Sequence, residues 1–356
     1  MRIAVIGLGL IGGSIALAAR ERLGAETAGW DLDPSALAAA GARGAVDVQS
    51  RSIAQAVDRA DAAFVAAPVG ALPELVAEVL RHASGGCVVT DVGSTKRLVV
   101  AAQDDQRFVG GHPLAGAETA GIEHARPDLF DGATWYLTPT ATTSGILYER
   151  LHRLLTSLGA RPVAIDAGDH DAILAVVSHL PHVLANVLVE EAATALGSGG
   201  ERLPATGPSF RDATRVAGAN TQVWTDIYLS NRDALSAAID ATIDRLGRVR
   251  DALTAGEAAA IATWNDEAAA ARRRLAADQL AVGDLHELRV SVPNRPGVVA
   301  QIALELGRAG VNIADLALYP APDMSEGVVA VWLAGSDTAA RAELIIGELG
   351  LQVFRP

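Results

Sequence analysis

Close to the N-terminus, residues 3–12 read IAVIGLGLIG, an apolar run that leads directly into three glycines with the spacing G-x-G-x-x-G. The apolar run predicts a buried strand, and the residues after the glycines continue as a helix. In this context Gly7 permits a tight turn, Gly9 lets the backbone approach a pyrophosphate, and Gly12 lets the helix pack closely on the strand. The stretch therefore predicts the first βα unit of a dinucleotide-binding fold, with the phosphates at the helix N-terminus.

A carboxylate follows at the distance that this motif requires. Asp31 ends the second predicted strand about 20 residues after the glycines, where it can accept hydrogen bonds from ribose hydroxyls. It would repel a 2′-phosphate, and no arginine stands immediately after it, so NAD is expected rather than NADP. Asp33 is the candidate cap of the next helix. Pro68 ends the third strand, where it either stiffens a loop beside the cofactor or is a plain turn proline. The predicted cofactor-binding residues are Gly7, Leu8, Gly9, Leu10, Ile11, Gly12, Asp31 and Pro68.

Short apolar runs alternate with helical patterns up to about residue 165. The predicted strands cover residues 3–6, 27–30, 62–67, 88–92, 108–110, 135–137 and 162–165. This alternation is typical of an α/β Rossmann-type fold with a doubly wound, mostly parallel sheet. We therefore expect an NAD-binding domain over residues 1–165.

From about residue 166 to 282 the strand-like runs give way to apolar residues at helical spacing, as in Leu235, Ile239, Ile243, Leu246 and Val249. This pattern predicts an all-α domain for substrate binding and dimerisation. A helical block with several apolar faces commonly completes its burial against a second copy. We expect a homodimer, and a self-contained bundle is the alternative.

The last block, residues 283–356, follows the order strand, helix, strand, strand, helix, strand. The predicted elements cover residues 288–292, 298–308, 313–318, 328–333, 338–349 and 351–354. That order predicts a small ferredoxin-like α/β domain. The charged stretch 272–284 is the expected linker between the second and third domains.

Composition limits the possible function. The 356-residue chain has a formal net charge of −13, spread along its length, which disfavours nucleic acid and anionic membranes as partners. Cys87 is the only cysteine, so no intrachain disulfide can form, and a reducing, cytoplasmic location is expected. No stretch is expected to span a membrane, because charges interrupt the alanine-rich segments. The eight histidines show no metal-ligand spacing, and no metal is expected. His170, between two aspartates, is interpreted as a helix-start feature.

Four further segments carry chemistry-bearing residues. They are residues 91–96 (DVGSTK), 110–116 (GGHPLAG), 177–182 (VSHLPH) and 210–217 (FRDATRVA), with Trp224 downstream. In order and spacing they resemble prephenate dehydrogenases, over roughly residues 1–250. The resemblance implies NAD-dependent oxidative decarboxylation of prephenate to 4-hydroxyphenylpyruvate, a step of tyrosine biosynthesis.

Some roles can be argued from the residues, and the resemblance supplies others. An imidazole is suited to accept a hydroxyl proton near neutral pH, and the resemblance implies that His112 does so. Ser178 and His182 are four residues apart, so they share a helix face, and the proline between them is expected to bend the helix. By resemblance both face the substrate, and Ser94 lies between nicotinamide and substrate. The alternative for Ser94 is a strand-end hydroxyl that bonds its own loop. His179 points elsewhere and is interpreted as a packing residue.

Two arginines are candidate anion binders. Arg211 and Arg215 share a helix face, and Asp212 can pair with Arg215, which is also the usual pattern of a solvated ion-pair face. The resemblance assigns a substrate carboxylate to Arg215, whose guanidinium suits a bidentate contact, and Arg211 is a second donor. Trp224 either walls the pocket or packs between helices.

The C-terminal block contains residues 292–298 (VPNRPGV) and 310–313 (GVNI), which resemble an ACT regulatory domain. The implied regulatory residues are Asn294, Gly297, Asn312 and Ile313. Asn294 stands where many relatives carry Asp, which puts the contact to a ligand ammonium group in question. We expect feedback inhibition by an aromatic amino acid effector, tyrosine. A purely structural or dimerising module is the alternative.

Three other functions remain open. Arogenate dehydrogenase has the same chemistry on the amino-acid analogue of prephenate. A non-catalytic NAD-binding sensor is a function of a different class, which intact His112 and Arg215 disfavour. A generic hydroxyacid or pyrroline-type reductase would share the first two domains without needing the His112 and Ser178/His182 segments together. No chorismate mutase segment precedes residue 1, so a second activity is not expected.

Overall fold

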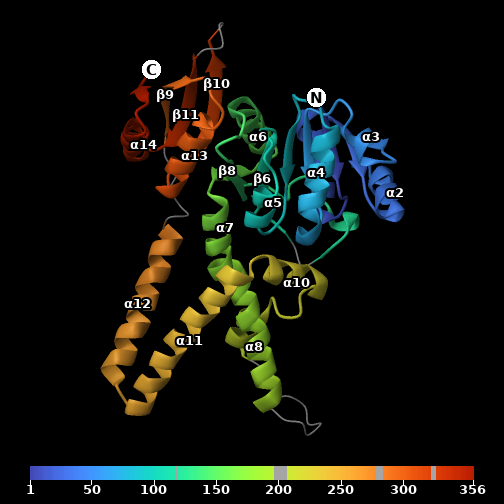
Figure 1. Cartoon of the computed structure of the whole chain (residues 1–356). Coiled ribbons are helices and arrows are strands. Elements are labelled where there is room, and N and C mark those ends of the chain that lie inside the picture. Colours follow the sequence, from blue (N-terminus) through green and yellow to red (C-terminus); the bar gives the residue numbers. More distant parts are fainter. Residues whose placement is uncertain (117–118, 196–206, 278–283, 322–325) are drawn as a thin grey trace. The chain divides into compact units, whose positions relative to one another are not determined.

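The computed structural model describes residues 1–116, 119–195, 207–277, 284–321 and 326–356 (Figure 1). The chain divides into two compact units. The first combines Met1–His170 with Gly283–Pro356, and the second is Asp171–Val282.

An eight-stranded sheet forms the centre of the first unit. Its strands are β1 (Arg2–Ile6), β2 (Glu26–Trp30), β3 (Val48–Gln49), β4 (Ala62–Val65), β5 (Val88–Asp91), β6 (Phe108–Pro113), β7 (Thr134–Thr138) and β8 (Arg161–Ala164). They lie in the order β3-β2-β1-β4-β5-β6-β7-β8. All neighbouring pairs are parallel except β6 and β7, which are antiparallel. The predicted Rossmann-type, mostly parallel sheet is confirmed. The two-residue strand β3 was not predicted, because it is too short to leave an apolar run.

Helices pack on both faces of this sheet. They are α1 (Leu10–Leu23), α2 (Pro34–Ala42), α3 (Ile53–Val57), α4 (Leu72–His82), α5 (Arg97–Ala101) and α6 (Gly145–Ser157), and α7 (Ala167–Leu174) follows β8. Along β1, Ile3 and Val5 belong to one apolar core, whereas Ala4 and Ile6 belong to another. Because successive side chains of a strand point to opposite faces, β1 is buried on both sides, as expected of a central parallel strand.

The end of β6 differs from the prediction. The apolar pattern ended the strand at Gly110, but β6 continues to Pro113, and His112 pairs in register with Tyr136 of β7. The two glycines hid this extension because glycine has low strand propensity. Gly111 is required here, since a Cβ at this position would lie 2.6 Å from the carbonyl oxygen of Asp91. His112 is therefore held inside the sheet rather than in a loop after it.

The C-terminal segment of the first unit forms its own four-stranded antiparallel sheet. Its elements are β9 (Leu285–Pro293), α13 (Val298–Arg308), β10 (Ile313–Pro320), β11 (Glu326–Ala334), α14 (Ser336–Glu348) and β12 (Gln352–Phe354), and the strand order is β10-β11-β9-β12. The predicted order of elements along the chain is present. This segment packs closely on the nucleotide-binding sheet: a Cβ at Gly307 of α13 would lie 2.0 Å from the carbonyl oxygen of Ala164 in β8.

The second unit is helical, as predicted. It contains a π-helical turn (Ala175–His179), α8 (Leu180–Ala195), α9 (Pro208–Thr214), α10 (Thr221–Ser230), α11 (Arg232–Ala255) and α12 (Ala258–Ala277). The expected linker is wrong in its first half, because residues 272–277 belong to α12. Alanine and arginine both favour helix, and this preference outweighed the density of charge. Residues 278–283 of the expected linker lie outside the described residues.

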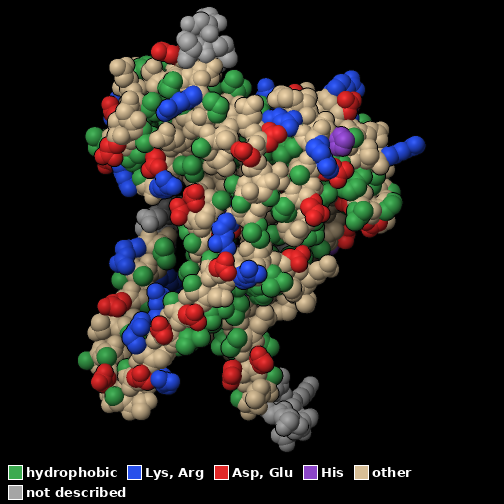
Figure 2. All heavy atoms as spheres, viewed as in Figure 1, with side chains coloured by type: hydrophobic (Ala, Val, Ile, Leu, Met, Phe, Trp, Pro, Cys, Tyr) green, Lys and Arg blue, Asp and Glu red, His purple; other side chains and the backbone are tan. Residues whose placement is uncertain are grey.

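The core of this unit is small. Along α11, Leu235 is 5% exposed, but Ile243 and Leu246 of the same stripe are 59% and 60% exposed. Figure 2 shows hydrophobic side chains at the surface among acidic and basic ones, which are interspersed on the face in view. An apolar surface that one copy of the chain does not bury is typical of an interaction site.

One helical stretch in the described part of the chain, Ala167–Ala195, is long and apolar enough to cross a membrane, by length and composition only. The reason given for expecting no membrane span, interruption of the apolar segments by charges, does not hold for this stretch. The charged residues that were expected to interrupt such segments are missing from the middle of this stretch, where Val176 and Val177 are exposed. Exposed apolar helix surfaces occur at protein interfaces as well as in membranes, so this property alone identifies neither.

Candidate active site

The glycine turn and Asp31 line one pocket at the carboxyl ends of β1, β2 and β4. Its lining includes Gly7, Leu8, Gly9, Asp31 and Pro68, five of the eight predicted cofactor-binding residues. The other three, Leu10, Ile11 and Gly12, form the first turn of α1. This is the edge of a parallel sheet at which dinucleotides bind.

The glycines meet the geometric demands of the motif. Gly7 has a φ of +95°, and a Cβ there would lie 2.1 Å from the carbonyl oxygen of Ala66. A Cβ at Gly12 would lie 1.9 Å from the carbonyl oxygen of Gly7, so the helix packs directly on the turn. At Gly9, by contrast, a Cβ would meet no atom within 4 Å. The open space beside Gly9 is where a pyrophosphate would approach the backbone.

Asp31 lines this pocket directly after β2, where the ribose of a dinucleotide would bind. One carboxylate oxygen accepts a hydrogen bond from the N–H of Leu8 at 2.6 Å, and the other accepts from the N–H of Asp33 at 2.8 Å. Asp33 in turn caps α2 by accepting from the N–H of Ser35, as predicted. Glu74 and Glu78 of α4 also line the pocket. Because all three side chains are acidic, the pocket fits NAD and disfavours the added phosphate of NADP.

The loop that carries Ser94 is fixed by a buried ion pair. Asp91, at the end of β5, forms a salt bridge with Lys96, and both side chains are fully buried. The same carboxylate accepts hydrogen bonds from the N–H of Gly93 at 2.8 Å and of Gly111 at 3.1 Å. One carboxylate therefore ties the Ser94 loop to β6, next to His112. The sequence showed this motif, but the pairing of its first and last residues was not predicted.

His112 contacts a second buried histidine. Its Nδ1 lies 2.9 Å from Nε2 of His170, and the two side chains are 9% and 0% exposed. The ring of Tyr136 packs edge-on against His170, with centroids 5.5 Å apart and planes at 87°. Burial raises the pKa of Tyr136, which therefore stays a neutral phenol. His170 does lie near the start of a helix, as interpreted, but its contact with His112 was missed.

In the second unit, Ser178 and His182 are joined across one turn. Nδ1 of His182 lies 3.1 Å from the carbonyl oxygen of Ser178. A carbonyl only accepts, so Nδ1 carries the proton and Nε2 presents a lone pair. The ring stacks on Trp224, with centroids 3.4 Å apart and planes at 26°. Burial lowers the pKa of His182, opposed by the Ser178 carbonyl and reinforced by the charge of Arg215, so the imidazole is neutral near pH 7.

His179 points into the core of the same unit, as interpreted. It is 1% exposed, and its Nδ1 lies 3.1 Å from Nδ2 of Asn231. Nδ2 of Asn231 also donates to the carbonyl oxygen of Asp171 at 2.7 Å. Asn231 thus fixes the turn that precedes Ser178, although no sequence pattern marked it.

Arg211 and Arg215 occupy the end of α9. Arg211 lies in its last turn and Arg215 is its C-cap, and both are exposed. The electrostatic effect of Arg215 on His182 places its charge near that imidazole. The charge of Arg215 therefore acts on His182, one of the two residues predicted to face the substrate.

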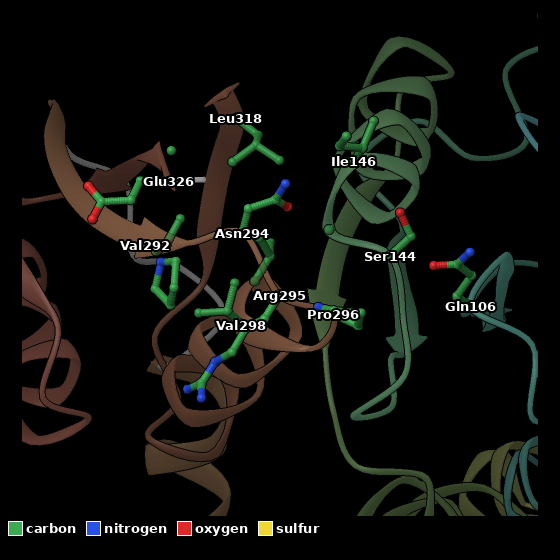
Figure 3. A pocket seen from close by; sticks show the side chains of 14 residues that line it. Gln106, Ser144, Ile146, Val292, Asn294, Arg295, Pro296, Val298, Leu318 and Glu326 are labelled. Carbon is green, nitrogen blue, oxygen red and sulfur yellow. The ribbon is translucent and has the colours of Figure 1, made fainter. Parts of the chain in front are cut away.

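The four predicted regulatory residues fall at two places. Asn294 lines a groove between the loop after β9 and the start of α6, where Figure 3 shows it facing Ser144 and Ile146. The N–H of Gly297 donates to the carbonyl oxygen of Thr143 at 3.0 Å. Asn312 and Ile313 follow the other end of α13. A helix of 11 residues separates the two pairs, about 16 Å at 1.5 Å per residue.

Neither a metal site nor a reactive cysteine is found among the described residues. Among the residues described, no group of three His, Cys, Asp or Glu side chains is placed to hold a metal ion. Cys87 is buried, and burial raises the pKa of its thiol to about 12, so it is not a nucleophile near neutral pH.

A dinucleotide pocket and a buried imidazole thus lie on one parallel sheet, at the edge where such sheets bind their ligands. Binding a nicotinamide cofactor and handling a proton beside it are the tasks of a dehydrogenase. The chain is an NAD-dependent oxidoreductase. Two family models then define it further. "Prephenate dehydrogenase, nucleotide-binding domain" matches residues 15–164, and "Prephenate dehydrogenase, dimerization domain" matches residues 166–266. Together they span more than half of the chain, which belongs to the prephenate dehydrogenase family.

Individual relatives agree with this assignment. A prephenate dehydrogenase of Bacillus subtilis (strain 168) is 32% identical over 357 residues, 97% of this chain and 95% of the relative. The crystal structure of prephenate dehydrogenase from Aquifex aeolicus in complex with hydroxyphenyl propionate and NAD+ has a TM-score of 0.72 at 28% identity, and the match covers 77% of this chain and 98% of that one. Synechocystis arogenate dehydrogenase has a TM-score of 0.68 at 28% identity, over 77% of this chain and 100% of that one.

Proposed function

We propose that this protein oxidises and decarboxylates prephenate to 4-hydroxyphenylpyruvate, with NAD as hydride acceptor, in tyrosine biosynthesis. The observation that carries the proposal is the buried imidazole of His112 on the sheet that also carries the dinucleotide pocket. Similarity over 97% of the chain to the Bacillus prephenate dehydrogenase supports the choice of substrate.

The reaction needs a hydride acceptor and a group that takes up a proton and later returns it. When bound, NAD accepts the hydride from the hydroxyl-bearing ring carbon. His112 accepts the hydroxyl proton, so that this carbon becomes a carbonyl. The bond to the ring carboxylate then breaks, its electron pair makes the ring aromatic, and carbon dioxide leaves. The former carbonyl oxygen takes a proton back from His112 and becomes the phenol. The balance is one hydride and one carbon dioxide lost from the substrate, with the proton returned.

The other site residues bind and orient the substrate in this proposal. Arg215 holds a substrate carboxylate, with Arg211 as a second donor. Ser178 and His182 contact the substrate, and the Nε2 lone pair of neutral His182 is an acceptor for a hydroxyl group. Ser94, on the loop held by Asp91, lies between nicotinamide and substrate. Holding the reacting carbon against the nicotinamide supplies a large part of the rate enhancement.

The deciding experiment follows NADH absorbance after the full-length protein is mixed with NAD and prephenate, and separately with NAD and arogenate. NADH formation with prephenate supports the proposal. NADH formation with arogenate alone would assign the activity that the Synechocystis relative is named for. No NADH with either substrate would favour a non-catalytic NAD-binding sensor.

We further propose a homodimer in the cytoplasm. The second family model is a dimerization domain, and it coincides with the unit whose apolar residues lie exposed in a single chain. Burying these side chains against a second copy would stabilise the dimer by roughly 25 cal/mol for each Å² of apolar surface removed from water. Sedimentation of the full-length protein tests this, and a monomer at micromolar concentration would contradict it.

We also propose that the C-terminal segment is an ACT domain through which tyrosine inhibits the enzyme. Its order of elements and the groove beside Asn294 support this assignment. If tyrosine binds in the groove, Asn294→Ala should raise the inhibitory tyrosine concentration at least about tenfold, as loss of a hydrogen bond to a charged group does. Asn312→Ala, at the other end of α13, should leave it unchanged. Equal effects of the two substitutions would indicate a tyrosine site formed by two copies of this domain. Inhibition by tyrosine that persists after removal of residues 284–356 would overturn the proposal.

A further inference from the structure

The contact between His112 and His170 constrains where protons can lie. Nδ1 of His112 and Nε2 of His170 are 2.9 Å apart, so one nitrogen donates a hydrogen bond and the other accepts it. A neutral imidazole carries one proton, on one of its two nitrogens. In neutral His112, the choice made at this contact therefore decides whether Nε2 carries a proton or a lone pair that can accept one.

Only one of the two arrangements is compatible with Nε2 of His112 acting as a base. If His112 donates from Nδ1, its Nε2 has a lone pair and can accept a proton. If His170 donates instead, the proton of neutral His112 must lie on Nε2, and the ring cannot act as a base there. The geometry points to His170 as a positioning residue that accepts the Nδ1 proton of His112 and so holds it in the tautomer that can take up the substrate hydroxyl proton. This inference rests on the proposed role of His112.

His170 is itself well fixed for this task. Its backbone N–H donates to the carbonyl oxygen of Asp166 at 2.8 Å, in the first turn of α7. The carboxylate of Asp166 caps this turn by accepting from the N–H of Gly168 at 2.7 Å. The ring of His170 is packed against Tyr136, the cross-strand partner of His112. The backbone of α7 and the pairing of β6 with β7 thus hold both imidazoles.

The same contact supports the charged form of the base. When His112 takes the substrate proton, its Nδ1–H becomes a donor from a cation, and a hydrogen bond from an ionised donor is stronger than one between neutral groups. His170 then does for His112 what a carboxylate does for the histidine of a hydrolase triad: it sets the tautomer and supports the imidazolium.

Two variants separate this role from simple packing. His170→Leu fills the space but has no acceptor, whereas His170→Gln keeps an amide oxygen that can reach towards Nδ1 of His112. We expect His170→Leu to lower kcat by about 10²-fold, less than the roughly 10⁴-fold loss when a charged tautomer-setting partner is removed, with KM for prephenate changed by less than about threefold. His170→Gln should recover most of the lost kcat. Equal losses in both variants would overturn the inference.

A measurement without turnover keeps the test independent of the proposed reaction. In the full-length protein labelled with 15N-histidine, the His112 signals, assigned by their loss in His112→Asn, should show the proton on Nδ1. In His170→Leu a large share should move to Nε2. A wild-type His112 protonated on Nε2 overturns the inference even if neither His170 variant folds. If His112 shows the expected tautomer but His112→Asn retains full turnover, the proposed role of His112 fails while the histidine pair stands.

Discussion

The two units of this molecule hold their polar residues in different ways. In the nucleotide-binding unit, Asp91 is fully buried and bound by Lys96 and two backbone N–H groups, and His112 is fixed by His170. In the helical unit, Arg211 and Arg215 are exposed, and His182 is half-buried against Trp224. Buried contacts within the protein orient the first set, called the rigid set, whereas the second, called the exposed set, is accessible to solvent.

This difference indicates that the rigid set acts on the transition state and the exposed set binds the substrate. Groups that act on the transition state are most effective when they are already oriented, because no reorganisation is then needed during the reaction. Groups that hold the substrate equally in the ground and transition states change KM rather than kcat. We therefore expect substitutions in the rigid set to lower kcat and substitutions in the exposed set to raise KM.

The largest effect is expected at His112. His112→Asn removes the proton acceptor, so kcat should fall by about 10²–10⁴-fold, as for loss of a general base. KM for prephenate should change by less than about threefold, because the side chain acts on the proton rather than on binding. Steady-state NADH formation measures both constants. His82→Asn, the same change at an exposed position of α4, is the matched control. A kcat within about twofold of wild type would remove His112 from the mechanism.

The same unit contains another buried histidine, His152, which among the described residues lacks the histidine partner that His112 has. His152 of α6 is 1% exposed, and neither of its ring nitrogens forms a well-shaped hydrogen bond with a described residue. Burial lowers its pKa from 6.5 to about 4, against the opposing effects of the Asp315 carboxylate and the Ile313 backbone. The unfolded chain therefore binds a proton between these two pH values that the folded chain does not. Folding stability should fall as pH drops from about 6.5 to about 4, and be unaffected by this group above that range.

His152→Leu tests this contrast with His112. At 1.36 kcal/mol per pKa unit, His152 should account for about 3 kcal/mol of the stability lost over this pH range. The variant should lose that much less than wild type between pH 7 and pH 4, measured by urea unfolding of the full-length protein. His124→Leu, at an exposed position, controls for the loss of an ordinary histidine. Parallel pH profiles for wild type and His152→Leu would show that His152 has a partner in solution.

A smaller effect is expected at Arg215. Arg215→Ala should raise KM for prephenate by about 10–100-fold, since a charge-assisted hydrogen bond contributes about 1.5–3 kcal/mol and each tenfold change corresponds to 1.4 kcal/mol. At saturating prephenate, kcat should stay within about threefold of wild type. Arg250→Ala, in an exposed ion pair of α11, is the control for loss of a positive charge from this unit. A large fall in kcat with normal KM would contradict the division between the two units.

How far the sequence predicted these features depended on how local they are. The seven predicted strands of the first sheet followed from apolar runs, and the start of α2 followed from its capping residue Asp33, because both signals act over a few positions. The contact of His112 with His170 joins residues 58 positions apart, and no local pattern records it. Asp91 and Lys96 lay in a recognised motif, yet their pairing depends on burial that only the packed sheet provides. At residues 272–277 a local signal was misjudged: their charge density predicted a linker, but their helix propensity places them in α12.

The smallest effect is expected at Trp224, where the contrast between the units is sharpest. Trp224→Ala removes a stacked ring from His182, so the imidazole gains water and its pKa should rise from its lowered value towards the ordinary one. KM for prephenate should rise by no more than about tenfold, because an aromatic pair contributes about 0.5–1.5 kcal/mol beyond its buried area. Titration of His182 by NMR and steady-state kinetics measure the two changes, with Trp264→Ala on α12 as an exposed control. A fall in kcat with unchanged KM would mean that Trp224 acts on the transition state although it is half-exposed. Burial alone would then not predict which residues of this enzyme affect kcat.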